Sequence, residues 1–453
     1  MAALFSRFPS FSHGIHPPTA KDDTAGLPIR QFPFAPVLIV PLSQHIGAPS
    51  VPVVREGEEV RRGQLIARAD GFVSVAQHAP ASGVIRRIDF APAINGRMGE
   101  AIFVEPFPGS SQEIDEGVKC DLEGVKCDLE SASADDIIAA IQAAGIVGLG
   151  GAAFPTHVKL KPPEGKHVDT LVLNGVECEP FLTTDHRVML EQTEDIYTGI
   201  RYLLKATGAK RAIIGVEANK LDAVEKLRAA TPSDLKVTTE AVEVKYPQGA
   251  EKMLITALLD KEVPSGGLPA DVGVVVVNVA TAAEIGRLLP HGRGIQERVV
   301  TMSGPAVGKK GNYRIPIGTP LRFALEQVDI SDDVSRVFLG GPMMGQALSS
   351  LDIPITKGTS GFVAFTSAET GAPPAEYPCI RCAYCVDACP IHLNPSQLGI
   401  LALNREYERM AEEYNLMDCF ECGSCSYVCP SHIPLVQRFR ESKAILRQPK
   451  AVK

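Results

Sequence analysis

Two short cysteine runs near the C-terminus constrain the possible folds of this chain more than any other feature. Eight of the eleven cysteines lie in "CIRCAYCVDACP" at 379–390 and "CFECGSCSYVCP" at 419–430. Both runs have the spacing C-x2-C-x2-C-x3-C-P, in which three thiolates can bind three corners of one [4Fe–4S] cubane. Zinc, the alternative, uses two C-x2-C pairs around one ion and would leave the third cysteine of each run without a role. The spacing therefore predicts two [4Fe–4S] clusters.

The fourth cysteine of each run predicts a crossed set of ligands. It follows the triplet by four positions, where the chain has turned away and reaches the other cluster, as in bacterial two-cluster ferredoxins. Disulfides are not expected, because the first residues lack the apolar segment of a secretory signal. The first cluster is expected to bind Cys379, Cys382, Cys385 and Cys429, and the second Cys389, Cys419, Cys422 and Cys425.

Composition and hydropathy argue against two classes of partner. Acidic residues exceed basic ones by 53 to 45, and this net charge of −8 disfavours nucleic acid. The most apolar stretch, "VGVVVVNVA" at 272–280, has the length of a buried strand and not the ~20 residues of a membrane-spanning helix. We therefore expect a soluble protein with no direct membrane span.

A glycine-rich segment, "GIVGLGGAAFPTHVKL" at 145–160, predicts a phosphate-binding loop. It is not a Walker loop, because Gly151 stands where the lysine should be. Gly148, Gly150 and Ala153 match G-x-G-x-x-A, but that fingerprint should follow a strand. Here the preceding "DDIIAAIQAAG" has helical spacing, with Gly145 as the C-cap. The loop is thus nucleotide-like without belonging to either standard type.

Alternating β-rich, α/β and helical segments predict an α/β multidomain chain. Residues 31–105 resemble the barrel-sandwich fold of lipoyl carriers but have no carrier lysine between Ala69 and Ser82, so we interpret them as a docking or structural domain. The linker contains the duplicated heptapeptide EGVKCDL, and we expect no metal role for its Cys120 and Cys127. The expected parts are an N-terminal arm (1–30), the barrel-sandwich (31–105), a linker (106–135), a Rossmann-like α/β domain (136–294), a β-grasp (SLBB-like) module (295–365), a linker (366–377), a helical two-cluster ferredoxin domain (378–440) and a basic tail (441–453).

Four motifs of the α/β domain resemble the NADH-binding flavoprotein subunit of respiratory complex I. They are "GLGGAAFPTHVKL", "LVLNGVECEP", "YPQGAEKML" and "VVNVAT". In the same order, that family has G-x-G-G-A-G-F-P-T-x-x-K-W, N-A-D-E-S-E-P, Y-I-C-G-E-E-T-A-L and V-N-N-V-E-T. The resemblance implies a complex-I-type domain that binds FMN non-covalently and takes NAD(H) as its substrate.

The order of domains along the whole chain, with "GIHPP" near the N-terminus, resembles the RnfC/RsxC family. That resemblance implies an NADH-dependent, ion-translocating oxidoreductase subunit that passes electrons between NADH, FMN and two clusters. It also implies a peripheral position at the cytoplasmic face of the bacterial inner membrane, held by the membrane subunits and a ferredoxin-like iron–sulfur subunit of the complex. The basic tail is not expected to provide membrane attachment by itself, because salt screens such charges within ~8 Å.

Carried over position by position, the resemblance also implies the residues of the flavin and NADH sites. Lys159 is a compact cation for a phosphate or a reduced flavin ring. Glu177 and Glu179 follow a strand, where ligands meet open α/β sheets, and could bind nicotinamide or ribose; the alternative is a pair of solvated loop carboxylates. The implied FMN contacts are Gly148, Gly150, Gly151, Lys159, Asn174 and Asn278, and the implied catalytic residues are Lys159, Glu177 and Glu179.

The chain departs from the complex I pattern at four positions. Val176 replaces an aspartate, Ala250 a glutamate and Val277 an asparagine, which removes polar contacts to FMN or NADH. Cys178 replaces a serine, and we interpret it as a packing residue.

Two other functions fit parts of the sequence. A stand-alone flavin/iron–sulfur cobalamin reductase shares much of this architecture. A non-catalytic docking scaffold that has lost its flavin is the second alternative, although eight intact cysteine ligands argue against it.

Overall fold

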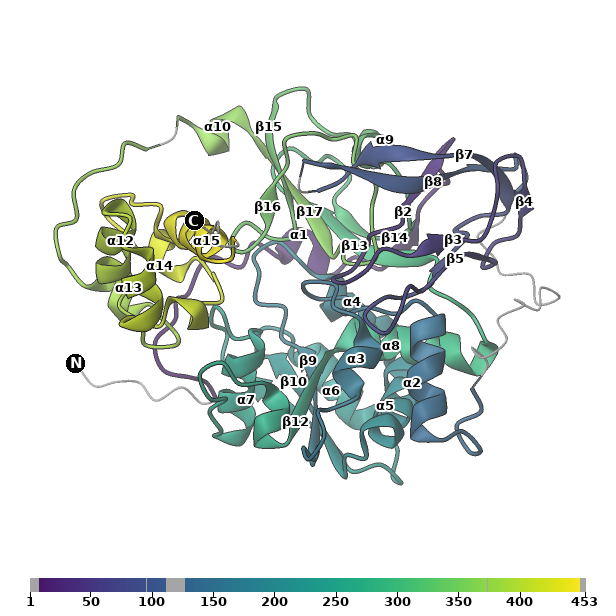
Figure 1. Ribbon diagram of the computed structural model, residues 1–453, viewed down its shortest axis with the longest axis horizontal. Coiled ribbons are helices and arrows are strands. Elements are labelled where there is room, and N and C mark those ends of the chain that lie inside the picture. The colour runs from purple at the N-terminus through teal and green to yellow at the C-terminus, as the bar shows by residue number, and fades with distance from the viewer. Residues whose placement is uncertain (1–7, 95, 111–126, 373, 449–453) are drawn as a thin grey trace, which may run out of the picture.

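The computed structural model describes residues 8–94, 96–110, 127–372 and 374–448. Figure 1 shows a domain built on a parallel sheet at the bottom, a barrel of short strands at the upper right, a second sheet between them and a small helical domain at the left. Most of the heptapeptide duplication, Cys120 included, lies outside the described residues. Among the residues that are described, no helix is long and apolar enough to cross a membrane.

The parallel sheet at the bottom of Figure 1 has four strands in the order β11-β10-β9-β12. From β9 the chain adds strands on one side and then crosses to place β12 on the other, so the order reverses between β9 and β12. In open α/β sheets, ligands bind outside the carboxyl ends of the strands at such a switch point. The strands are β9 (Thr170–Gly175), β10 (Arg211–Glu217), β11 (Val237–Val242) and β12 (Val274–Asn278).

Helices cover both faces of this sheet because the strands are apolar on both sides. Leu171 and Leu173 face the core that contains α2, α5 and α8, whereas Val172 faces the core that contains α7. Gly199 and Gly286 let the backbones of α5 and α8 touch, since a Cβ at either position would meet the carbonyl of the other helix. The helices are α2 (Ala134–Ala143), α3 (Thr156–Leu160), α4 (Thr184–Glu191), α5 (Thr193–Thr207), α6 (Leu221–Ala230), α7 (Glu251–Leu259), η1 (Pro269–Val272), α8 (Val279–Leu288) and η2 (Leu289–His291).

The barrel-sandwich consists of two small antiparallel sheets, β2-β8-β7-β4 and β3-β5-β6. Alternate residues of the strands point inward, and Leu38, Ile66, Ile85 and Ile102 fill the space between the sheets. The strands are β2 (Leu38–Pro41), β3 (Val51–Pro52), β4 (Glu59–Val60), β5 (Leu65–Arg68), β6 (Gln77–His78), β7 (Gly83–Pro92) and β8 (Met98–Pro106).

The second sheet has six strands in the order β1-β14-β13-β17-β15-β16. An antiparallel β13–β14 hairpin is followed by α9 and by β17 parallel to β13, which is the arrangement of a β-grasp module. The elements are β13 (Glu297–Ser303), β14 (Gly311–Pro316), α9 (Leu321–Gln327), β15 (Val334–Leu339), β16 (Gln346–Ala347), β17 (Gly361–Thr366) and α10 (Ser367–Thr370).

The described part of the N-terminal arm packs into the structure. Phe11 and Ile15 are buried, and Ile15 exchanges two backbone hydrogen bonds with Tyr246 (2.8 and 2.9 Å). After α1 (Asp22–Ala25), β1 (Ile29–Gln31) pairs in parallel with β14. An arm of few apolar residues is ordered here because its backbone finds partners in two domains.

The helical domain at the C-terminus holds both cysteine runs, and its last helix extends past residue 440. Ser442 and Lys443 of the expected basic tail are buried, because helix α15 continues across the second run. The elements are α11 (Tyr384–Asp387), α12 (Pro395–Leu403), α13 (Tyr407–Glu412), η3 (Leu416–Asp418), α14 (Ser424–Tyr427) and α15 (Leu435–Leu446).

Candidate functional site

The glycine loop lies at the switch point of the parallel sheet, between α2 and α3. As expected, α2 precedes it and ends at Ala143; Gly145, just after the C-cap Ala144, has a φ of 73°. Two contacts hold the loop in place: the Leu149 amide donates to Thr281 Oγ1 on α8 (3.0 Å), and Arg298 Nη2 donates to the Leu149 carbonyl (3.0 Å). The loop is thus fixed at the carboxyl end of β12.

The tip of the loop presents free backbone donors. Gly148 donates to the Phe154 carbonyl (2.8 Å) and closes the loop. Between these two residues, the amides of Gly150, Gly151, Ala152 and Ala153 have no protein acceptor among the residues the structure describes. Gly150, Gly151 and Ala152 are exposed, and a Cβ on Gly151 would meet nothing within 4 Å. Consecutive free amides in such a turn form an anion-binding concavity, which fits the phosphate of FMN.

Asn174 and Asn278 lie at the carboxyl ends of neighbouring strands and are paired in register. The Asn278 side chain accepts from the Ala280 amide (2.8 Å), donates to Asp185 Oδ2 (2.7 Å) and fills the space beside Gly150. Asn174 Nδ2 donates to the Gly249 carbonyl (2.8 Å), which leaves its second amide hydrogen for a ligand. Both side chains therefore shape the floor of the site.

Lys159 lies on α3, which follows the glycine loop directly. Its Nζ forms an ion pair with Glu251 at the start of α7, and each side chain is 35% exposed. The sequence places Lys159 beside the loop, but its carboxylate partner comes from 92 residues away. The ammonium group is therefore already paired with a carboxylate, and its partial exposure leaves it accessible to an anionic ligand as a second partner.

Glu177 and Glu179 are close in sequence but have different partners. Glu177 accepts from the amides of Asp185 (2.8 Å) and His186 (3.3 Å) at the start of α4. Glu179 accepts from the amides of Met343 (3.1 Å) and Met344 (2.6 Å) in the second sheet domain. Neither is the freely solvated loop carboxylate of the alternative interpretation.

The sequence analysis missed two buried charges at this edge. Lys21 of the arm, 6% exposed, donates from Nζ to the carbonyls of Glu177 (3.0 Å), Glu179 (2.8 Å) and Leu182. Asp185 is buried, and burial together with the charge of Glu177 raises its pKa to about 7, against the lowering effect of the Asn278 hydrogen bond. Neither residue lies in a recognisable motif, so only the fold identifies them.

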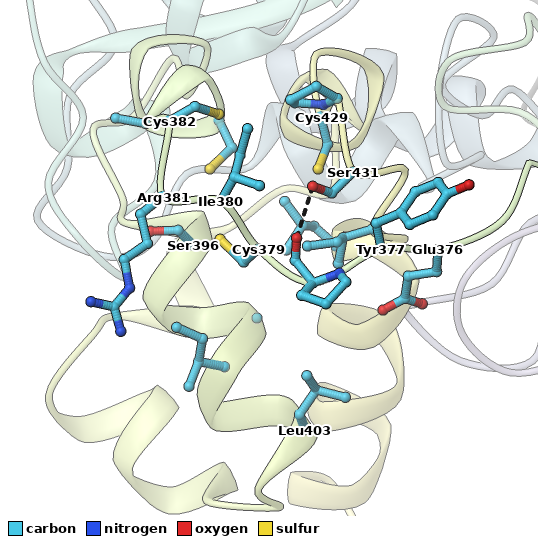
Figure 2. Close-up of a pocket in the computed structure, with 18 of the residues that line it drawn as sticks. Glu376, Tyr377, Cys379, Ile380, Arg381, Cys382, Ser396, Leu403, Cys429 and Ser431 are labelled. Atoms are coloured by element: carbon cyan, nitrogen blue, oxygen red, sulfur yellow. Dashed lines mark hydrogen bonds between the residues drawn. The ribbon is translucent and has the colours of Figure 1, made fainter.

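The eight cysteines of the two runs form two groups in space. The first group lines a cavity of about 80 Å³ and contains the triplet of the first run with the last cysteine of the second run (Figure 2). The second group lines a smaller cavity of about 20 Å³ and contains Cys389 with the triplet of the second run. These are the two sets that the spacing predicts: Cys379, Cys382, Cys385 and Cys429 in the first, and Cys389, Cys419, Cys422 and Cys425 in the second.

The two cavities differ in their surroundings. The first is open at the surface, where Tyr377 (60% exposed), Ile380 (68%) and Leu403 (63%) surround it. The second lies against the parallel-sheet domain. There Tyr246, four residues after the edge strand β11, donates from its hydroxyl to the Cys422 carbonyl (2.7 Å). Four thiols around each cavity are the donor set of a [4Fe–4S] cluster.

Two features define the class of this protein. Free amides lie at the switch point of a parallel sheet, and the helical domain holds two pockets of four thiols each. Together they define an electron-transfer flavoprotein with two iron–sulfur clusters. Family models support each part, matching residues 141–287 (Nuo51 FMN-binding domain), 9–107 (RnfC barrel sandwich hybrid domain) and 378–433 (4Fe-4S dicluster domain). The C subunit of the proton-translocating ferredoxin:NAD(+) oxidoreductase complex of Clostridium ljungdahlii is 43% identical over 96% of this chain, and 93% of that relative is covered. The chain belongs to this family, RnfC.

A second relative agrees with that membership. The C subunit of the Na(+)-translocating ferredoxin:NAD(+) oxidoreductase complex of Acetobacterium woodii is 42% identical over 96% of both chains. A solved NAD+-reducing [NiFe]-hydrogenase in the air-oxidized state covers 72% of this chain and 67% of its own at 21% identity, with a TM-score of 0.49, which is too distant to carry an argument. The expected fold class, FMN and [4Fe–4S] cofactors and family are therefore confirmed.

Proposed function

We propose that this chain is the NADH-oxidising subunit at which electrons enter a membrane-bound Rnf complex, a transfer that the complex couples to ion translocation. The observation that supports it is a chain of contacts between the two sites. Gly150 of the glycine loop lies beside Asn278, which is paired in register with Asn174. Asn174 donates to the Gly249 carbonyl, and Tyr246, three residues before Gly249, donates to the Cys422 carbonyl. Relatives named as the C subunits of ferredoxin:NAD(+) oxidoreductase complexes support the same assignment. They favour it over a stand-alone cobalamin reductase or a docking scaffold.

In this proposal the free amides of 150–153 hold the FMN phosphate, with Gly148 closing the loop and Lys159 supplying a cation. When bound, FMN takes up two electrons from NADH and releases them singly. Asn174 and Asn278 form the floor of the site. The side-chain amide of Asn278 already donates a hydrogen bond to Asp185. Asn278 therefore orients a ligand mainly through the space that its side chain occupies.

We assign Glu177 and Glu179 to NADH binding. Each carboxylate oxygen that accepts a backbone amide retains a second lone pair, which can accept from a ribose hydroxyl or the nicotinamide amide. Lys21 Nζ donates hydrogen bonds to the backbone carbonyls of both residues and so fixes the loop between β9 and α4. The positions of the two carboxylates are thereby set before any substrate arrives.

The second cysteine group is joined to the flavin-binding domain by the Tyr246–Cys422 hydrogen bond. We therefore propose that Cys389, Cys419, Cys422 and Cys425 would hold the cluster nearer the flavin. Cys379, Cys382, Cys385 and Cys429 would hold the outer cluster, whose exposed apolar rim would face the electron acceptor. The acceptor is a ferredoxin-like iron–sulfur subunit of the complex. Membrane subunits hold this chain at the cytoplasmic face of the inner membrane.

The experiment is a pair of absorption spectra of anaerobic, FMN-loaded protein before and after NADH. We expect bleaching of both flavin and cluster bands. Gly151→Ala should lower FMN affinity at least about tenfold without unfolding the protein, because the added methyl group meets no protein atom within 4 Å and can obstruct only the ligand. Gly99→Ala on β8, where a Cβ also has free space, is the matched control. Full FMN affinity in Gly151→Ala would place the flavin elsewhere.

A further inference from the structure

Tyr246 joins the flavin-binding domain to the second cluster group. Its side chain is 1% exposed and packs with Ile15, Ala388, Cys422 and Val428. Its hydroxyl donates to the Cys422 carbonyl at 2.7 Å, and its backbone pairs with Ile15 of the N-terminal arm. A buried tyrosine hydroxyl needs a hydrogen-bond partner, and here that partner is the peptide of a proposed cluster ligand.

The segment that follows Tyr246 is fixed to the sheet edge. Gly249, three residues later, accepts from Asn174 Nδ2 (2.8 Å) and donates to the Cys178 sulfur (3.4 Å). One short stretch of chain therefore contacts the floor of the flavin site at one end and the Cys422 peptide at the other. Any shift of Tyr246 moves Cys422 relative to that floor.

Further contacts hold the second cysteine run against the flavin-binding domain and against the second sheet domain. Asp418, just before Cys419, accepts from Ser265 Oγ (2.5 Å) and from the Gly266 amide (3.2 Å). Gly423 has φ of 83° and approaches the Met343 carbonyl so closely that a Cβ would lie 3.1 Å from it. These contacts fix the two sides of the run. Between them, the Tyr246 hydroxyl of the flavin-binding domain reaches the Cys422 carbonyl, and Lys443 of the cluster domain reaches the Cys419 carbonyl.

We propose that Tyr246 is a positioning residue that holds the Cys422 peptide and raises the reduction potential of the cluster bound by Cys389, Cys419, Cys422 and Cys425. The physical reason is the direction of the hydroxyl dipole. Its positive end points at the ligand peptide, and hydrogen bonds around a cluster stabilise the extra negative charge of the reduced state. The inference rests on the cysteine assignment in the proposed function, but not on NADH as the electron donor.

The hydroxyl is a donor at physiological pH, because the phenol of a tyrosine has an ordinary pKa of about 10. Tyr246→Phe preserves the ring and its packing and removes only this donor.

The test is a mediated redox titration of the reconstituted full-length protein, followed by electron paramagnetic resonance. In Tyr246→Phe we expect the cluster that Cys422 binds to move to a lower potential. The cluster that Cys379 binds should keep its wild-type potential. Tyr384→Phe, an exposed tyrosine (58%) beside Cys385, is the matched control and should move neither. Unchanged potentials in a Tyr246→Phe protein with full iron content would overturn the proposal.

A second variant keeps the test decisive if Tyr246→Phe fails to assemble its clusters. Placing 3-fluorotyrosine at position 246 makes the hydroxyl a stronger donor with little change in shape, so the same cluster should move to a higher potential. A shift in the opposite direction, or in the other cluster, would contradict the assignment. Because mediators and dithionite set the potential, the result does not depend on whether NADH reduces the protein.

Discussion

At the residue scale, Cys389 lies in the first cysteine run by sequence and in the second group by position. Burial raises the pKa of its thiol, and the charge of the nearby Cys419 thiol raises it further. Cys389 lines the second cavity together with the triplet of the other run. The chain from Cys385 to Cys389 runs through one helical turn, α11, which advances the backbone by about 6 Å along the helix axis and so carries Cys389 past the first cavity to the second. One turn of helix thus produces the crossing.

This crossing predicts the outcome of a single substitution. Cys389→Ala should remove the cluster of Cys419, Cys422 and Cys425 and leave that of Cys379, halving the iron content to about four per chain, because each cubane needs its four thiolates. Mössbauer and electron paramagnetic resonance spectra measure which cluster survives. Cys178→Ala, a half-buried cysteine of the flavin-binding domain that lines neither cavity, should retain both clusters. Loss of the cluster of Cys379 in Cys389→Ala would disprove the crossed set.

At the scale of elements, helix α15 ties the end of the chain to the second cysteine run. Lys443, 4% exposed, donates from Nζ to the Cys419 carbonyl and to Glu421 Oε1 (3.1 Å). Phe439 of the same helix is 1% exposed in the core of the cluster domain. Part of the sequence that looks like a basic tail is therefore a structural helix.

The helix predicts different results for two truncations. Removing 441–453 should lower the free energy of unfolding by about 2 kcal/mol and lower the occupancy of the second cluster, because it removes the buried Lys443, whose charged Nζ donates to the Cys419 carbonyl, while Glu421 keeps Arg440 (3.1 Å). Removing only 447–453 should change neither, since α15 ends at Leu446. Thermal unfolding and iron analysis of the two truncated proteins provide the measurement. Equal stability of both would show that Lys443 does not support the run.

At the scale of the whole molecule, a buried carboxylate joins three domains. Glu297 at the start of β13 pairs with Arg62 of the barrel-sandwich (2.5 Å), Arg314 of its own sheet (3.3 Å) and Arg287 of the flavin-binding domain (3.5 Å). Burial by itself would raise the pKa of Glu297, but the three guanidinium groups outweigh it and hold the pKa below its ordinary value. Glu297 is therefore one of the contacts that set the relative placement of the barrel-sandwich and flavin-binding domains.

Glu297→Gln should lower the free energy of unfolding by about 3 kcal/mol at neutral pH, because it leaves buried arginines without a counter-charge. A carboxylate whose pKa is lowered on folding stabilises the protein above its unfolded pKa of about 4.3, and this contribution is lost as the pH falls through the folded value. The difference between wild type and variant should thus be constant above about pH 5 and shrink below it. Urea unfolding at several pH values measures this. Glu105→Gln, which breaks an exposed pair with Arg86, is the control and should have no measurable effect.

The sequence by itself determined the parts of this protein whose chemistry depends on local spacing. Each of these parts occupies a few consecutive residues, where the geometry of the backbone fixes which side chains can meet. They are the two cysteine runs, the glycine loop after a helix, and the strand ends that carry Asn174 and Asn278. The resemblance to a known family then supplied their order along the chain.

The tertiary structure decided everything that joins distant segments. Lys21 reaches the loop of Glu177 from the N-terminal arm, Glu251 reaches Lys159 from the start of α7, and Tyr246 reaches Cys422 across 176 residues. None of these pairs has a sequence signal, because a long-range contact depends on how whole domains pack and not on spacing along the chain. The same holds for the carboxylates of Glu177 and Glu179, whose backbone partners became visible only when α4 and the second sheet were in place.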